Sequence, residues 1–156
     1  MNVYSTRPVA ARHDRNGASA LPLARILVVF ESTPNGVAAL REAAELSGAD
    51  SHLTVVTLAP QGLPSGCCGS SVEAVNCAVR ETAQRELRTA HEILGDTADR
   101  ATFKSLVGIH DPPLAAWAAA QHFDLIFLPS RRLAFGGHPF ARRLRRATTA
   151  ELLLVR

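Results

Sequence analysis

The side chains with the clearest chemistry lie in a turn that follows an apolar segment, Asp124 to Leu128. The turn reads Pro129-Ser130-Arg131-Arg132, and in parallel α/β proteins ligands bind at the turns that follow the strands. Guanidinium groups bind phosphates and carboxylates through paired hydrogen bonds. An anion is therefore a candidate ligand for Arg131 and Arg132, although the turn has no glycine that would bring backbone amides close to a phosphate.

Basic residues are concentrated toward the two ends of the sequence. Residues 1–25 carry a net charge of +3, residues 26–128 carry −6, and residues 129–156 carry +6 with seven Arg and one acidic residue. Arginines that could attract phosphates or nucleic acid are Arg131, Arg132, Arg142, Arg143, Arg145 and Arg146. The alternative is a solvated helix face that balances an acidic body, and charge alone leaves both interpretations open.

Cysteine offers a second candidate chemistry. Cys67 and Cys68 are adjacent in an expected Gly-rich loop, and Cys77 follows in an expected helix. Adjacent thiols could form a vicinal disulfide or bind a soft metal with a third thiolate. However, no C-x-x-C motif is present, and three cysteines leave one unpaired. The placement of Cys77 on a helix favours a small core residue.

Histidine and serine give no recognisable catalytic constellation. The histidines are dispersed without H-x-x-x-H or triad spacing, and the serines of the loop lack an identifiable base. These residues are His91, His110, His122, His138, Ser65, Ser70 and Ser71. Asp111 is expected to cap a helix. We therefore predict no catalytic residue and no metal site.

Five segments predict strands, and the continuous apolar character of the first favours a strand that is buried on both faces of a sheet. The expected strands are Arg25 to Phe30, Leu53 to Leu58, Thr102 to Val107, Asp124 to Leu128 and Glu151 to Val155. The second is also expected to be buried, whereas Lys104 and Ser105 interrupt the third and make it weaker. A loop from Pro60 to Gly69 is rich in Pro and Gly, which regular elements tolerate poorly. The last strand is apolar throughout and is expected at a sheet edge, where it could pair with another chain.

Helices are expected between these strands. Starts are predicted at Thr33-Pro34, at Ser70 or Ser71, and at Asp111-Pro112, and a short basic helix precedes the last strand. Their inward stripes would be Val37, Leu40, Ala44 and Leu46; Val72, Val75, Val79, Ala83, Leu87, Ala90 and Leu94; and Leu114, Trp117 and Ala118.

This alternation predicts a five-stranded open parallel sheet with helices on both faces, which is a doubly wound α/β fold. Three turns should converge at one edge, namely Glu31 to Asn35, Leu58 to Gly62 and Pro129 to Arg132. We expect one domain over residues 25–156, preceded by a flexible tail over residues 1–24. The tail lacks the apolar region of a secretory signal, and no apolar run could span a bilayer, so cytoplasmic localisation is expected.

The order and spacing of these segments resemble the universal stress protein family over about Arg25 to Arg156. The matching segments are Ile26-Leu-Val-Val-Phe-Glu-Ser-Thr33, Leu53 to Leu58, Gly108 to Leu114 with Pro112, Asp124 to Ser130, and Leu152-Leu-Leu-Val-Arg156. The resemblance implies an adenine nucleotide alpha hydrolase-like fold and a role in stress response. It also implies a homodimer formed through the last strand.

The sequence departs from the glycine-rich signature that ATP-binding family members carry after the fourth strand. Pro129 stands at the first glycine and lacks an N–H, and Arg132 stands at the second. The closing Gly-Ser is replaced by Gly136-Gly137-His138-Pro139, after an interval about four residues shorter than the family's. The phosphate loop has therefore either degenerated or been rebuilt around arginine.

Positions that contact the adenosine part of ATP in family members that bind it keep side chains of similar chemistry in this sequence. The family's aspartate after the first strand, which can contact ribose or adenine in binders, aligns with Glu31, while Thr33 and Ser130 keep hydroxyl groups. The candidate binding residues are Glu31, Thr33, Leu58, Ser130, Arg131, Arg132, Gly136 and Gly137.

We expect a regulatory or interaction protein of the universal stress type that does not bind ATP robustly and is not an enzyme. The alternative is a nucleotide-binding module with weak ATP hydrolysis or ATP-dependent switching through Glu31, Ser130 and Arg131. A third hypothesis is an arginine-driven binder of nucleic acid or a phosphometabolite, with nucleic acid not the expected partner. No cofactor is expected under the first hypothesis, and ATP or another anion under the others.

Overall fold

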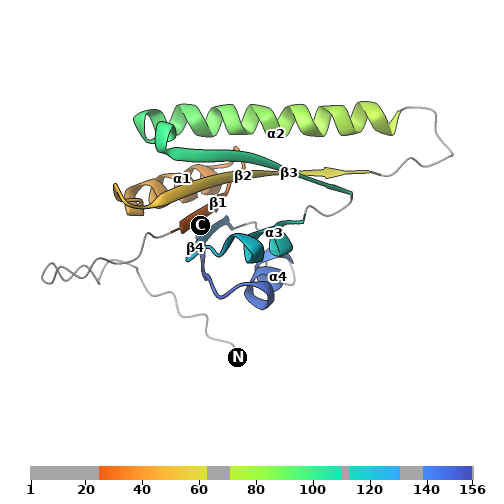
Figure 1. Cartoon of the computed structure of the whole chain (residues 1–156). Coiled ribbons are helices and arrows are strands. Elements are labelled where there is room, and N and C mark those ends of the chain that lie inside the picture. Colours follow the sequence, from red (N-terminus) through yellow and green to blue (C-terminus); the bar gives the residue numbers. More distant parts are fainter. Residues whose placement is uncertain (1–24, 63–70, 110–112, 131–138, 156) are drawn as a thin grey trace, which may run out of the picture.

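Five parallel strands form one open sheet in the computed structural model, which describes residues 25–62, 71–109, 113–130 and 139–155. The strands are β1 (Arg25–Val29), β2 (His52–Gln61), β3 (Ala101–Ile109), β4 (Leu125–Pro129) and β5 (Glu151–Val155), in the order β3-β2-β1-β4-β5. The helices are α1 (Pro34–Leu46), α2 (Val72–Leu94), α3 (Leu114–Gln121) and α4 (Pro139–Ala147), with a 3₁₀ helix, η1 (Gly95–Arg100). The predicted doubly wound α/β fold is confirmed (Figure 1).

The central strands separate two apolar layers. Ile26 and Val28 of β1 belong to a core cluster with residues of α1 and α2, whereas Leu27 and Val29 belong to a second cluster with residues of α3 and α4. All four side chains are at most 2% exposed. Because alternate side chains of a strand point to opposite faces, a continuous apolar run is what a strand covered on both sides requires.

Helix α1 begins where the sequence predicts. Thr33 is its N-cap, with Pro34 as its first residue, and both residue types favour these positions. Its buried residues are Gly36, Ala39, Leu40 and Ala43. Leu46 was expected to face inward but is 40% exposed, because it is the last residue of α1.

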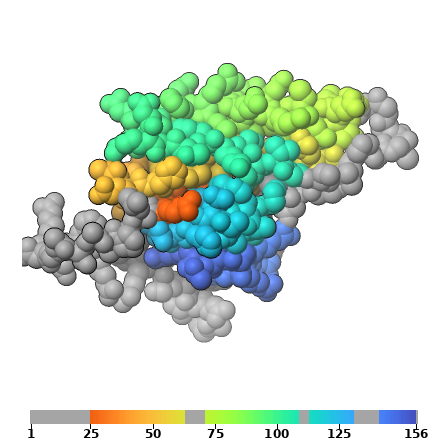
Figure 2. All heavy atoms as spheres, viewed as in Figure 1, coloured from red at the N-terminus to blue at the C-terminus, as the bar shows by residue number. Residues whose placement is uncertain are grey.

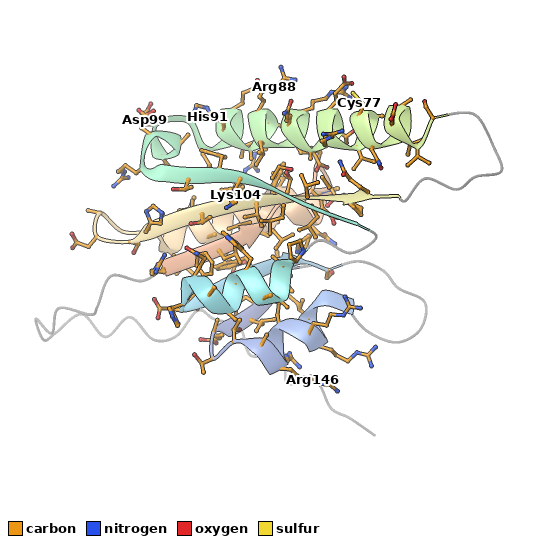
Figure 3. The ribbon with its side chains drawn as sticks, turned by 45° about the vertical axis from the view of Figure 1, so that its right-hand side comes forward. Cys77, Arg88, His91, Asp99, Lys104 and Arg146 are labelled. Carbon is orange, nitrogen blue, oxygen red and sulfur yellow. The ribbon has the colours of Figure 1, made fainter. Side chains whose placement is uncertain are left out.

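Helix α2 begins after its N-cap Ser71, as expected, but its apolar stripe is buried only in part. Ala83, Ala90 and Leu94 are buried, whereas Val75 is 60% exposed. The reason is geometric: together with the ends of β2 and β3, the first half of α2 reaches past β1 and β4 (Figure 1). Cys77 lies on this projecting half and is exposed, so its expected core position is wrong (Figure 3).

Strand β2 is longer than predicted and includes Pro60, which was assigned to a loop. β1 pairs with β2 only from Arg25↔His52 to Val29↔Val56, whereas β3 accompanies β2 as far as Gln61↔Ile109. Pro60 is therefore on a segment with one paired side, where a missing N–H interrupts no second ladder. Similarly, Pro129 was expected in a turn but is the last, buried residue of β4, opposite Val155 of β5.

Several expectations lie outside the described residues and stay predictions. They concern the tail over residues 1–24, the paired cysteines, the arginine turn and the capping role of Asp111. The residues are Cys67, Cys68, His110, Asp111, Pro112, Arg131, Arg132, Gly136, Gly137 and His138. The third helix itself begins at Leu114 after Pro113 as its N-cap, so its predicted start at Asp111-Pro112 is wrong. Among the helices in the described part of the chain, none is long and apolar enough to cross a membrane.

Candidate functional site

The strand order places a topological switch point between β1 and β4. The chain winds outward from β1 through β2 to β3, then returns to β4 on the other side of β1. Ile26 to Val28 pair in parallel with Leu125 to Phe127, so both strands end at the same edge. Doubly wound proteins bind ligands outside the strand ends at such a point. The residues to consider are therefore 30–37, after β1, and Ser130, after β4.

The segment after β1 uses its backbone amides within the protein. The amide of Phe30 donates to the carbonyl oxygen of Val56 at 2.8 Å. The Ser32 amide donates to a carboxylate oxygen of Glu86, on α2, at 3.2 Å. The Thr33 amide donates to the carbonyl oxygen of Glu31 at 2.7 Å. These amides are consequently committed to protein acceptors.

The first turn of α1 is occupied in the same way. Thr33 Oγ1 accepts a hydrogen bond from the Gly36 amide at 3.1 Å, and the Thr33 carbonyl accepts one from the Val37 amide at 2.9 Å. Pro34 has no N–H to offer. A helix N-terminus binds anions through unused amides of its first turn. Here the Thr33 side chain caps the Gly36 amide, and the Val37 amide makes the first helical bond.

A hydrogen bond crosses the switch point from α1 to the end of β4. Asn35 Nδ2 donates to the carbonyl oxygen of Ser130 at 2.8 Å and lies 3.4 Å from Ser130 Oγ. The Ser130 amide donates in turn to the carbonyl oxygen of Val155, on β5, at 2.7 Å. Asn35 and Ser130 are half-buried. Ser130 thus joins the first turn of α1 to the ends of β4 and β5.

Gly36 allows the close contact between α1 and the end of β1. A Cβ at this position would overlap the carbonyl oxygen of Glu31 and lie 3.0 Å from its carbonyl carbon. Real Cβ atoms essentially never approach a backbone atom so closely. Gly36 therefore sets how near Asn35 comes to Ser130.

The predicted binding residues are only partly brought together. Glu31, Thr33 and Ser130 lie at the switch point, Glu31 half-buried and Thr33 exposed. Leu58 was expected in a turn but lies within β2, which continues to Gln61, and it packs against the second core cluster. The remaining candidates, Arg131, Arg132, Gly136 and Gly137, are outside the described residues.

Sequence reasoning missed Asn35, Gly36 and Glu86. A glycine inside a helical pattern is a signal for a close backbone approach, and Gly36 could have been found in this way. Asn35 and Glu86 are ordinary helix residues in the sequence. Their contacts join positions 95 and 54 residues apart, so only the tertiary structure shows them.

The chemistry of the described site is that of hydrogen-bonding groups and two carboxylates, Glu31 and Glu86. No group of three or more His, Cys, Asp or Glu side chains arranged to hold a metal ion occurs among the described residues. Cys77 Sγ lies 3.6 Å from a carboxylate oxygen of Glu81 on the same helix, which is a surface contact. Cys67 and Cys68 lie outside the described residues, so their joint role stays a prediction.

These features define the protein as a doubly wound α/β domain with a switch point between β1 and β4. Among solved structures, this is the fold of the universal stress proteins. UspA from Lactobacillus plantarum superimposes with a TM-score of 0.69 at 18% identity, covering 87% of this chain and 99% of that one. A universal stress protein family member from Burkholderia pseudomallei gives 0.64 at 22% identity, with coverages of 90% and 98%.

A universal stress protein in complex with cAMP gives a TM-score of 0.59 at 16% identity, covering 87% of this chain and 99% of that one. No protein-family model and no curated protein matches the sequence. At these identities, the similarity establishes a shared fold. The predicted resemblance is thus confirmed at the level of the fold.

Proposed function

We propose that the protein is a cytoplasmic regulatory or interaction protein of the universal stress type that acts without robust ATP binding and not as an enzyme. The shared fold supports the family. The sequence supports the loss of ATP binding, because Pro129 and Arg132 stand where family binders carry glycine. Regulation would then depend on surfaces that contact other molecules.

The observation that carries this proposal is the use of polar groups at the switch point. The amides of Ser32, Thr33, Gly36, Val37 and Ser130 all donate to protein oxygens. The Asn35 side chain links the first turn of α1, which follows β1, to Ser130, which follows β4. A phosphate at this point would have to replace bonds that already exist, so it would gain little net free energy.

Isothermal titration of the full chain with ATP is expected to show no stoichiometric binding at micromolar concentration. The reason is that the described amides are committed and the glycine signature is altered. A parallel titration with cAMP tests whether the adenosine side alone suffices, and circular dichroism confirms that the chain is folded. Stoichiometric heat at micromolar ATP would contradict the proposal.

Such a result would favour the second candidate, a nucleotide-binding module with weak ATP hydrolysis or ATP-dependent switching. Its support is the cAMP complex of a structural neighbour, together with the placement of Glu31 and Ser130 at the switch point. Arg131 would supply positive charge in that case. If a Glu31→Gln variant then showed no heat of ATP binding, Glu31 would be identified as a contact to the adenosine part of the nucleotide.

We further propose that the protein forms a homodimer through β5. This strand is at one edge of the sheet, and Leu154 on it is 43% exposed. An unpaired edge with apolar side chains can add a strand from another chain. β3 provides the matched comparison, since it is the opposite edge and its Val107 is 44% exposed.

Sedimentation velocity at micromolar concentration is expected to show a dimer. Leu154→Lys should shift the chain to monomer, because a charge on an edge strand opposes strand addition. Val107→Lys, which adds the same charge at the other edge, should leave the dimer intact. A monomeric unmodified chain, or a dimer that only Val107→Lys disrupts, would contradict this assembly.

A further inference from the structure

The exposed side of α4 consists of arginine. Arg142, Arg143, Arg145 and Arg146 are exposed, whereas Ala141 and Leu144 are buried in the second core cluster, Leu144 completely. Successive helix residues are turned by about 100°, so Arg142, Arg145 and Arg146 fall within an arc of about 100°. We call these three residues the arginine face. Figure 3 shows Arg146 pointing away from the body of the protein.

The arginine face has no local counter-charge in the helices that carry it. α4 contains no Asp or Glu, and its neighbour α3, with the sequence LAAWAAAQ, contains no charged residue. On α2 the basic residues are interspersed with acidic ones, because Glu81 precedes Arg85 and Arg88 precedes Glu92 by one helical step of four residues. A solvated surface that merely balances charge is expected to resemble α2, and α4 does not.

This arrangement costs a little helix stability. Arg142 and Arg146 are four residues apart, and like charges at this spacing repel each other across one turn. The cations near the end of α4 gain some interaction with the helix dipole, but Arg142 is in the first half. The buried Leu144 fixes the orientation of the helix, so Arg142, Arg145 and Arg146 project from its exposed side.

We propose that the arginine face binds the phosphodiester backbone of nucleic acid without reading its sequence. Arg142 and Arg146 are four residues apart, which is about 6 Å along the helix axis, and phosphates follow one another by about 3.4 Å of axis along each strand of a duplex. The arginine face therefore spans about two phosphate steps, so its three arginines can contact about three successive phosphates. α4 has no Asn or Gln to recognise adenine by paired hydrogen bonds, so contacts to phosphate carry the binding.

An anionic membrane is the competing occupant, and the packing of α4 argues against it. Amphipathic helices that bind lipid insert their apolar face among the acyl chains. The apolar side of α4 is already packed in the core through Ala141 and Leu144, so it is closed to lipid. Nucleic acid needs only the charged side, which is the side that α4 exposes.

The test is fluorescence anisotropy of a labelled duplex of about 20 base pairs with the full chain, at salt concentrations from about 50 to 200 mM. We expect the association constant to fall as salt rises, since each neutralised phosphate releases counterions. An Arg142→Gln/Arg146→Gln variant should reduce the salt slope by about two units. Over this fourfold change in salt, the difference in slope amounts to about 16-fold in affinity.

Arg85→Gln/Arg88→Gln is the matched control, because it removes the same charge from the exposed side of α2. α2 and α4 lie at opposite margins of the molecule (Figure 2), and Arg88 and Arg146 point in opposite directions in Figure 3. This control should keep the salt slope of the unmodified chain. Thermal melts should show both variants folded, with the α4 variant at least as stable as the unmodified chain.

Three outcomes would overturn the inference. The first is no binding to the duplex at about 50 mM salt. The second is an equal loss in both variants, which would make net charge and not α4 responsible. The third is binding to vesicles containing phosphatidylserine in preference to the duplex. The loss of ATP binding proposed above is measured separately and stands or falls without this result.

Discussion

Replacing Gly36 by alanine is expected to lower the free energy of unfolding by about 2–3 kcal/mol. In a typical helix this substitution stabilises by up to about 1 kcal/mol, because alanine has the higher helix propensity. Here a Cβ would overlap the Glu31 carbonyl oxygen, which is backbone at the end of a core strand and cannot rotate aside. The start of α1 must then move away from β1.

Gly48→Ala is the matched control for this measurement, because a Cβ at Gly48 would meet nothing within 4 Å. It should leave the protein unchanged or stabilise it by about 0.4–1 kcal/mol. Urea denaturation of both variants measures the two effects. If Gly36→Ala were as stable as Gly48→Ala, the close contact between α1 and β1, and with it the Asn35–Ser130 bridge, would be wrong.

Phe127→Ala is expected to cost about 3–5 kcal/mol of unfolding free energy. Phe127 is completely buried on β4, between Val28 of β1 and Leu153 of β5 in the sheet. Its removal leaves a cavity at the strand that positions Ser130. Because small domains are stable by only about 5–15 kcal/mol, this variant should unfold at a much lower urea concentration than the unmodified chain.

Val75→Ala is the control for apolar truncation, since this valine is 60% exposed on the projecting half of α2. Surface substitutions of this kind usually change stability by less than about 0.5 kcal/mol. A similar loss in both variants would show that α2 packs its first half against another surface in solution. If Phe127→Ala lowered the free energy of unfolding only slightly, the burial of Phe127 described here would be wrong.

The proposed function combines the fold of the universal stress proteins with a switch point whose amides bond within the protein. The described amides around the switch point are engaged by Glu86, by the cap residue Thr33 and by β5. The outward arginines of α4 lie on a helix that is packed through Leu144. The proposed activity of the protein therefore resides in surfaces, at the β5 edge and on α4.

The fold could be predicted because the residues within each helix or strand carry the sequence pattern typical of that element. The run at Ile26 to Val29 is apolar at every position, and the run at Leu53 to Leu58 is apolar apart from two threonines, as a strand covered on both faces requires. Thr33-Pro34 and Ser71 mark helix starts by capping chemistry that acts over three residues. Such signals are short in range and so survive in a single sequence.

Burial along α2 and the length of β2 could not be predicted in this way. Val75 has the same apolar spacing as Ala83, but it is exposed on the half of α2 that reaches past β1 and β4. Pro60 is compatible with β2 because β1 stops pairing four residues earlier, at Val56. Both facts depend on where other strands end.

The sequence by itself determined the five strands, the helix starts, the altered glycine signature and the concentration of arginine before the last strand. The tertiary structure alone decided that Asn35 bonds Ser130 and that Glu86 holds the Ser32 amide. It also decided that Leu144 points into the core while the arginines of α4 face outward. The physical reason is range: propensity and capping act between neighbours along the chain, whereas hydrogen-bond partners and burial are set by segments that only folding brings together.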